Sequence, residues 1–191
     1  MHALVMDLVA ARRGHFLLES GHHGELWLDL DAAFWSAAAL DPVVDALAGR
    51  LVGADAVCGP LAGGAFLAQL VAGRLGIGFA YTERVSAGDG ALYSARYDLP
   101  VALAPRLAGR RVAVVDDVIN AGSATRSTVA ALVAAGADVV SLAAMLTLGA
   151  TPARIAAEAA LPLEALATLD AEIWAPADCP RCARGEPLSK R

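Results

Sequence analysis

The feature that most constrains the fold is a series of short, continuously apolar runs separated by loops and helical segments. The runs have the length of strands and stand at residues 54–59, 77–83, 111–117, 137–146 and 161–170. Helices are expected between or after them, at residues 64–74, 124–135 and 151–159. Strands that are apolar on both faces need cover on both faces, as in a parallel sheet between helices. The pattern therefore predicts an α/β fold with a parallel sheet flanked by helices.

The N-terminal part of the chain has a different pattern. An amphipathic helix is expected over residues 2–13, ending at Gly14. Two strands are expected over residues 15–21 and 25–31, on either side of a glycine-containing turn, because leucines alternate with other residues in the second of them. This part of the chain is therefore expected to form a small hairpin.

Two other segments complete the expected elements. A helix is expected over residues 41–52, because Asp41 can cap it and Pro42 suits its first turn. Residues 85–92 are expected to be irregular. Ligands of parallel α/β sheets bind outside the carboxyl ends of the strands. The loops that follow these strands are therefore expected to share one rim, and they are residues 59–64, 84–96 and 116–124.

Composition and charge exclude several classes of protein. The 191 residues suffice for one domain with a core, and a single domain over residues 1–191 is expected. A formal net charge of −5 argues against a nucleic-acid-binding protein, and the chain has one lysine, Lys190. The uncharged run at 56–73 is broken by glycine and proline, so no membrane span is expected. The N-terminus lacks the order of a signal peptide, and a cytoplasmic location is expected.

Two adjacent acids at the end of an apolar strand carry the clearest chemical signal. Asp116 and Asp117 follow the run at 111–115, and buried carboxylates are costly unless a ligand or cation uses them. Ribose hydroxyls are good partners for carboxylates. The alternative, a solvated turn, does not account for the loop and helix that follow.

The loop after the two acids is suited to an anion. Residues 120–124 are small, so successive backbone N–H groups can point inward, and a helix begins directly afterwards. Ser123 and Thr125 can add hydroxyl donors. The P-loop and the dinucleotide-binding loop are excluded, since the first needs a lysine and the second a G-x-G-x-x-G after a strand. Acids for a sugar and amides for a phosphate together predict a site for a 5′-phosphorylated ribose.

The stretch VAVVDDVINAGSATR, residues 112–126, resembles the phosphoribosyl-pyrophosphate (PRPP) signature of the type I phosphoribosyltransferases. Within that superfamily the chain most resembles the orotate phosphoribosyltransferases. Other segments are similar to the hood, the pyrophosphate loop, the strand before the flexible loop and the C-terminal tail of one branch of that family, namely residues 14–31, 58–68, 79–84 and 174–188. The resemblance implies a parallel α/β core at about residues 41–170, with a small hood formed by about residues 1–40 and the C-terminal segment.

The resemblance also implies a role for each matching residue. Asp116 and Asp117 would face the ribose hydroxyls, and Arg126 would pair with the orotate carboxylate. Arg84 would face the pyrophosphate, with Mg²⁺ held mainly by PRPP rather than directly by the protein. The residues implied to bind the 5′-phosphate and the pyrophosphate are Asn120, Ala121, Gly122, Ser123, Ala124, Ala62, Gly63 and Gly64. A homodimer is implied as well.

The chain departs from the family in its mobile loop. Residues 84–106 contain neither the lysine nor the histidine that usually close over the pyrophosphate. Arg84, Arg96 and Arg106 are the cations of this segment, and Arg84 and Arg96 are predicted to act as a charge clamp. Asn120 stands where the family usually has threonine.

Three functions remain open. The first is transfer of the phosphoribosyl group from PRPP to orotate, giving orotidine 5′-phosphate and pyrophosphate. The second is the same transfer to another base. The third is a PRPP-binding regulatory protein that has lost its catalytic loop, an interpretation favoured by the missing lysine and histidine and disfavoured by the absence of a DNA-binding segment.

The remaining histidines, cysteines and aromatic residues carry weaker signals. His22 and His23 are interpreted as part of a polar turn, because neighbours on a strand point to opposite faces. Cys179 and Cys182 form one C-x-x-C, which is interpreted as an ordinary tail turn, with a metal site shared across a dimer as the alternative. Trp27 is a candidate for stacking on the base.

Overall fold

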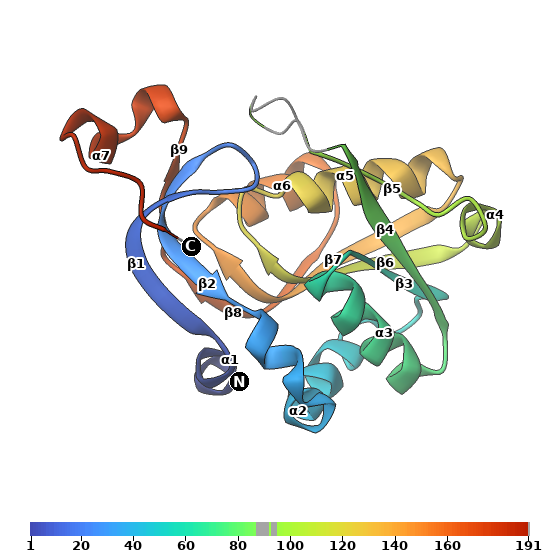
Figure 1. The fold of residues 1–191 in the computed structure, drawn as a ribbon. Helices are drawn as coiled ribbons and strands as arrows, with labels where there is room; N and C mark the ends of the chain where they lie inside the picture. The colour runs from blue at the N-terminus through green and yellow to red at the C-terminus, as the bar shows by residue number, and fades with distance from the viewer. Residues whose placement is uncertain (87–91, 93–94, 191) are drawn as a thin grey trace.

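The computed structural model of the chain describes residues 1–86, 92 and 95–190, and its core is a six-stranded sheet (Figure 1). The strand order is β5-β4-β3-β6-β7-β8. All neighbours are parallel except β5, which runs antiparallel to β4 at the edge. The strands are β3 (Ala56–Pro60), β4 (Gly78–Ser86), β5 (Arg96–Asp98), β6 (Arg111–Ile119), β7 (Asp138–Leu148) and β8 (Leu163–Leu169). The predicted parallel sheet is confirmed, with β5 as an unpredicted antiparallel addition.

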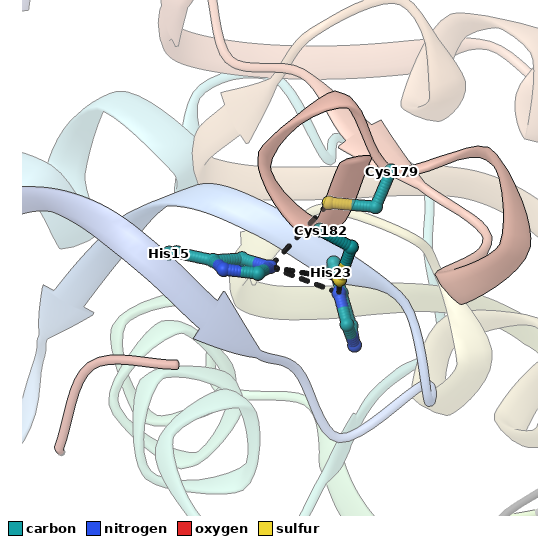
Figure 2. A group of neighbouring side chains, drawn as sticks. All are labelled: His15, His23, Cys179 and Cys182. Carbon is teal, nitrogen blue, oxygen red and sulfur yellow. Dashed lines mark hydrogen bonds between the residues drawn. The ribbon is translucent and has the colours of Figure 1, made fainter. Parts of the chain in front are cut away.

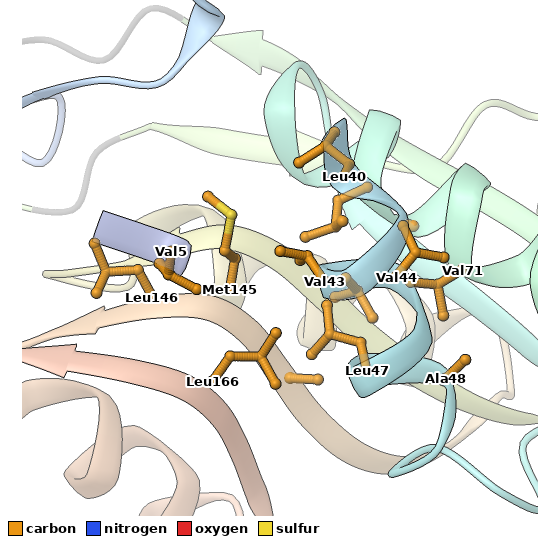
Figure 3. Close-up of a cluster of buried hydrophobic side chains, with 14 of the residues drawn as sticks. Val5, Leu40, Val43, Val44, Leu47, Ala48, Val71, Met145, Leu146 and Leu166 are labelled. Atoms are coloured by element: carbon orange, nitrogen blue, oxygen red, sulfur yellow. The ribbon is translucent and has the colours of Figure 1, made fainter. Parts of the chain in front are cut away.

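Helices cover both faces of this sheet, as the apolar strands predicted. The covering helices are α2 (Ala37–Ala48), α3 (Gly63–Leu75), α4 (Ala104–Leu107), α5 (Ser123–Ala134) and α6 (Thr151–Glu158). Successive residues of β6 belong to different cores: Ala113 and Val115 pack with α2 and α3, while Val112 and Val114 pack with α5 and α6. Figure 3 shows part of the first core, with Val43 and Leu47 of α2 and Met145 of β7. A strand buried on both faces is apolar along its whole length.

A second, three-stranded sheet has the order β1-β2-β9 and is called the hood sheet below. It joins the two ends of the chain, because His23 of β2 pairs with Trp174 of β9, and Figure 1 shows the C-terminal segment beside the N-terminal hairpin. Its strands are β1 (Ala10–Leu17), β2 (His23–Asp29) and β9 (Ile173–Trp174). The short helices next to them in the chain are α1 (His2–Leu8), η1 (Asp31–Trp35), η2 (Pro176–Asp178) and α7 (Pro180–Ala183).

The predicted helix over residues 2–13 is wrong beyond Leu8. Residues 10–13 belong to β1 and pair antiparallel with residues 26–29 of β2. Alanine and arginine favour a helix locally, but pairing with β2 outweighs that preference.

The helix predicted over residues 41–52 begins four residues earlier. Ser36 caps it, because the Ser36 hydroxyl oxygen accepts a hydrogen bond from the Ala39 N–H. Leu40, in the second turn, is buried in the core. Pro42 lies inside the helix, where it gives up one backbone hydrogen bond. The burial of Leu40 and the Ser36 cap outweigh the start signal of Asp41 and Pro42.

The uncharged run at 56–73 forms β3, a loop and most of α3, as predicted. None of the helices in the described part of the chain has both the length and the apolar character needed to cross a bilayer. Strand β4 continues to Ser86, two residues into the stretch predicted to be irregular. The rest of that stretch lies largely outside the described residues.

Candidate active site

The two acids lie near the carboxyl end of β6, which continues two residues beyond the predicted end, to Ile119. Asp116 is buried, and its carboxylate accepts hydrogen bonds from the Asp117 N–H (3.0 Å) and from the Thr125 hydroxyl (3.3 Å). The Asp117 carboxylate accepts one from the Val118 N–H at 2.7 Å. Each carboxylate is thus fixed by local donors. Asp116, Asp117 and Val118 all line a cavity of about 590 Å³.

Burial raises the pKa of both carboxyl groups, and the charge of Asp117 raises the pKa of Asp116 further. Asp31, at the start of η1, lines the same cavity and also raises the pKa of Asp117. Glu19 and Asp29 line it too, and five carboxyl groups around one cavity favour hydroxyl donors and cations over an anion at this point.

The loop of residues 120–124 wraps around the start of α5. Gly122 has a φ of 78°, and a side chain on it would collide with Ile155 of α6, so glycine is required here. Ser123 begins the helix, and its buried hydroxyl oxygen has no hydrogen-bond partner among the described residues. A buried hydroxyl without a partner beside a helix N-terminus is a ready donor for an anion. Five consecutive residues, 120–124, line a smaller cavity of about 190 Å³ with Asp116 and Thr125.

The glycines after β3 let that loop approach the acids. A Cβ on Gly63 would overlap the Asp117 carboxylate, and one on Gly64 would overlap the Asp116 carboxylate. The Leu61–Ala62 peptide bond is cis. Ala62, Gly63 and Gly64 line the cavity of Asp116 and Asp117. The predicted common rim of the loops at 59–64 and 116–124 is therefore present.

The hood sheet supplies the opposite wall. Trp27 of β2 lines the 590 Å³ cavity and an adjoining one of about 330 Å³, which also contains Asn120 and Arg84. Arg12 of β1 lines the larger cavity, and its guanidinium lies 6.0 Å from the centre of the Phe16 ring. The hood wall thus combines the Trp27 ring with one arginine, Arg12, while Arg84 comes from β4 of the core sheet.

Glu19, in the turn between β1 and β2, connects the hood to the core sheet. Its carboxylate accepts a hydrogen bond from the Tyr97 hydroxyl at 2.6 Å and pairs with Arg84 at 3.4 Å. Burial and the neighbouring Glu19 raise the pKa of Tyr97, so this hydroxyl keeps its proton at neutral pH. Arg84 thus reaches the site, with Glu19 as a partner.

Two predicted arginines lie elsewhere in this structure. Arg126, in the first turn of α5, pairs with Glu158 of α6 at 2.5 Å and does not line the three cavities above. This is the partner expected for a surface helix residue, and contact with a base stays a prediction. Arg96 pairs with Asp98 at 3.5 Å, and its side chain is 71% exposed. Most of the loop between Arg84 and Arg96 lies outside the described residues.

The sequence did not point to four residues of this site, namely Arg12, Glu19, Asp31 and Tyr97. The helix predicted over residues 2–13 concealed Arg12, which needs β1 to face the cavity. Glu19 lies in a turn whose position depends on the hood sheet. The short edge strand that carries Tyr97 has no sequence signal beyond the tyrosine itself.

A larger cavity, of about 910 Å³, lies at the amino ends of β3 and β4, opposite the strand ends near Asp116 and Asp117. It is lined by the starts of β3 and β4 and by α4, and it contains none of the predicted site residues. Ligand sites of parallel sheets form at the carboxyl ends of the strands. The cavities around Asp116 and Asp117 therefore remain the candidate site.

Comparison with known proteins agrees with this geometry. The chain matches the phosphoribosyl transferase domain over residues 36–172. It is 38% identical over 151 residues to an adenine phosphoribosyltransferase of Mycobacteroides abscessus, covering 75% of this chain and 85% of the relative. It is 30% identical over 183 residues to an orotate phosphoribosyltransferase of Thermotoga maritima, covering 95% and 91%. The crystal structure of orotate phosphoribosyltransferase from Aeropyrum pernix matches with a TM-score of 0.65 and 26% identity, over 84% of this chain and 88% of that one. The chain therefore belongs to the phosphoribosyltransferase family.

Proposed function

We propose that the protein transfers the 5-phosphoribosyl group of PRPP to orotate, producing orotidine 5′-phosphate and pyrophosphate. The observation that carries the use of PRPP is the buried hydroxyl of Ser123, which has no hydrogen-bond partner in the described part of the chain. Ser123 lies in the loop at 120–124, six residues after Asp117, and shares the smaller cavity with Asp116. A phosphate in the smaller cavity and a ribose beside Asp116 and Asp117 satisfy both features.

The residues act mainly by position and charge. Asp116 and Asp117 accept hydrogen bonds from the ribose hydroxyls, and the backbone amides of Ala62, Gly63 and Gly64 face the pyrophosphate. The bond from ribose C1′ to the pyrophosphate oxygen breaks, and the orotate ring nitrogen bonds to C1′ as its proton leaves. Arg84 offsets charge that develops on pyrophosphate.

Magnesium fits this cavity, because the carboxylates of Asp31, Asp116 and Asp117 supply negative charge and acceptors for the water molecules that the ion keeps. Bound with PRPP, it would neutralise part of the pyrophosphate charge. The carboxylates of this chain would then orient the ribose and reach the ion through its water shell.

Two observations favour orotate as the base. The orotate relative from Thermotoga maritima is matched over 95% of this chain, so that match takes in most of the hood and tail, whereas the adenine relative is matched over 75%. Arg126 directly follows the phosphate loop, and a guanidinium is the natural partner of the orotate carboxylate. In this proposal the orotate carboxylate displaces Glu158 from Arg126.

Adenine is the second candidate, since the adenine phosphoribosyltransferase relative has the higher identity, 38%. A neutral base needs no arginine. Trp27 and the apolar residues of the 330 Å³ cavity could stack on a purine.

The two candidate functions predict that different bases are consumed. Each base is incubated with the protein, PRPP and Mg²⁺, and its consumption is followed by ultraviolet absorbance. Arg126→Met is expected to raise the KM for orotate about tenfold or more, the range for a lost charged contact, and to leave the KM for PRPP unchanged. Arg154→Met is the matched control, because Arg154 also pairs with Glu158 but lies on α6. Turnover of adenine but not orotate, or equal effects of the two variants, would remove the orotate proposal.

We also propose a cytoplasmic homodimer. Trp35 of η1 is 93% exposed, and Phe66 of α3 is 48% exposed. The Phe66 ring packs against the ring of Phe34, the neighbour of Trp35 in the chain, and both phenylalanines line an apolar hollow. A second copy of the chain would cover this face. Light scattering of wild type and Trp35→Ser checks the dimer, and a monomeric wild type would contradict it.

A further inference from the structure

Four metal-ligating side chains from opposite ends of the chain meet outside the candidate active site. His15 and His23 come from the two strands of the hood hairpin, and Cys179 and Cys182 from the tail around α7 (Figure 2). Their ligand atoms all lie within 4.8 Å of one another. Figure 2 shows both sulfur atoms directed at the ring nitrogens.

The spacing of these atoms is that of a tetrahedral site. His15 Nε2 lies 2.9 Å from His23 Nδ1 and 3.4 Å from Cys179 Sγ. Cys182 Sγ lies 3.2 Å from His23 Nδ1 and 3.7 Å from His15 Nε2. Four ligands at ordinary zinc–nitrogen and zinc–sulfur bond lengths have edges of about 3.3–3.8 Å in a regular tetrahedron. The four separations above differ from these edges by less than 0.5 Å, and no separation in the group exceeds 4.8 Å, so shifts of up to about 1 Å bring the four atoms to that geometry.

The surroundings of His15 favour metal ligation through Nε2. Its Nδ1 lies 2.8 Å from the Glu186 carbonyl oxygen, to which it donates a hydrogen bond. This bond leaves Nε2 without a proton, and a carbonyl partner on the second ring nitrogen is the usual support of a metal-bound histidine. The His15 backbone is also tied to the tail, because its carbonyl oxygen accepts a hydrogen bond from the Ser189 N–H at 2.6 Å.

We propose that His15, His23, Cys179 and Cys182 bind one structural Zn²⁺ ion. Two thiolates and two imidazoles select zinc over magnesium or calcium, and four protein ligands leave no open position for catalysis. Both thiols lose their protons to solvent on binding. Three of the four side chains are buried, and Cys182 is exposed, which gives the ion a path of entry.

The ion would clamp the C-terminal tail to the hood hairpin. The turn between His15 and His23 contains Leu18, Glu19 and Ser20, which line the cavity of the 120–124 loop. The zinc site would therefore hold one wall of the candidate active site in place from behind. The proposal itself rests on the four ligands and does not depend on which base the protein uses.

Metal analysis of the purified wild-type protein, prepared without chelators or a histidine tag, tests the proposal directly. We expect about one zinc ion per chain. Replacing zinc with Co²⁺ should give the visible d–d bands of a tetrahedral ion together with a thiolate-to-cobalt charge-transfer band. X-ray absorption at the zinc edge should show two sulfur and two nitrogen neighbours. The proposal would be overturned if the purified protein contained no zinc and, after reduction, gave no such spectrum with Co²⁺. A Cys179–Cys182 disulfide in protein purified under reducing conditions would also overturn it.

Variants then assign the ligands. Cys182→Ser and His23→Asn should each lower the zinc content to well below half and remove the cobalt charge-transfer intensity in part or entirely. Cys58→Ala and His2→Asn are the matched controls, because Cys58 lies in β3 and His2 in α1, away from the group. Zinc retained in full by both ligand variants, or lost equally from the controls, would overturn the assignment. Hydrogen exchange of zinc-stripped wild type is a second measurement, and it needs no variant. We expect the loss of zinc to remove protection from exchange at residues 15–25 and 173–189.

Discussion

The close approach of α3 to the acidic pair makes Gly63→Ala the most informative substitution. A Cβ at Gly63 would overlap the Asp117 carboxylate, with the Asp117 Cγ at 2.6 Å and the Phe34 ring at 3.3 Å. The Asp117 Cγ must recede by at least about 0.4 Å to reach the shortest tolerated separation, and the carboxylate must move further. Because Asp117 is short, it meets this demand by rotating away, which breaks its hydrogen bond from the Val118 N–H.

The clash should therefore reduce activity more than stability. Crowding costs about 1–3 kcal/mol, and alanine regains about 0.5–1 kcal/mol in a helix, so the free energy of unfolding should fall by about 0–2.5 kcal/mol. Misplacing a positioning carboxylate by about 1 Å should lower kcat/KM for PRPP about a hundredfold.

Gly73→Ala is the matched control for this experiment. Gly73 lies in the same helix, and a Cβ there meets nothing within 4 Å, so this variant should gain about 0.5–1 kcal/mol and keep full activity. Urea unfolding and steady-state kinetics at varied PRPP measure both quantities. Equal kcat/KM in Gly63→Ala and Gly73→Ala would refute the reasoning.

Three further predictions concern buried polar groups. Burial and the Asp117 charge raise the pKa of Asp116 in the folded protein, whereas its pKa in the unfolded chain is about 4. The folded protein therefore loses stability as the pH rises from the unfolded pKa through the raised pKa. Asp116→Asn should therefore unfold at a higher urea concentration than wild type at neutral pH, with a difference that shrinks on acidification, and should be inactive; a less stable variant at neutral pH would contradict this. Ser123→Ala should keep wild-type stability but raise the KM for PRPP by about tenfold, since its hydroxyl has no partner among the described residues, and an unchanged KM would argue against a phosphate there. Burial raises the pKa of Cys58 to about 12, so a thiol reagent at mildly alkaline pH should label Cys58 only after urea unfolding, which peptide mass spectrometry checks, and rapid labelling of the native protein would contradict its burial.

Patterns that act locally were readable from the sequence. The apolar run before Asp116 indicates that β6 is buried on both faces, and such burial requires a parallel sheet with helices on each side. The loop at 120–124 was predictable for the same reason, because small residues, a glycine and a helix start are adjacent in the chain. The positions of Gly63 and Gly64 against the acids follow from the sheet order once the loops share a rim.

Features set by distant pairing were not readable. Residues 10–13 have helical preferences and become a strand only because residues 26–29 pair with them. The metal-ligating group needs His15 from the hairpin beside Cys182 from the tail, and the C-x-x-C pattern alone does not say which histidines it meets. A histidine on each strand of one hairpin, together with a C-x-x-C, was the signal available.

The hood sheet has a consequence for the order in which the protein matures on the ribosome. Its third strand, β9, is made about 150 residues after β2, with which it pairs. The strands of the core sheet end at Leu169, so all of them precede β9 in the chain. During synthesis from the N-terminus, the acidic pair and the loop at 120–124 are therefore made before the strand that completes the hood sheet. A newly made chain would thus contain the core side of its candidate active site first and the complete hood wall last.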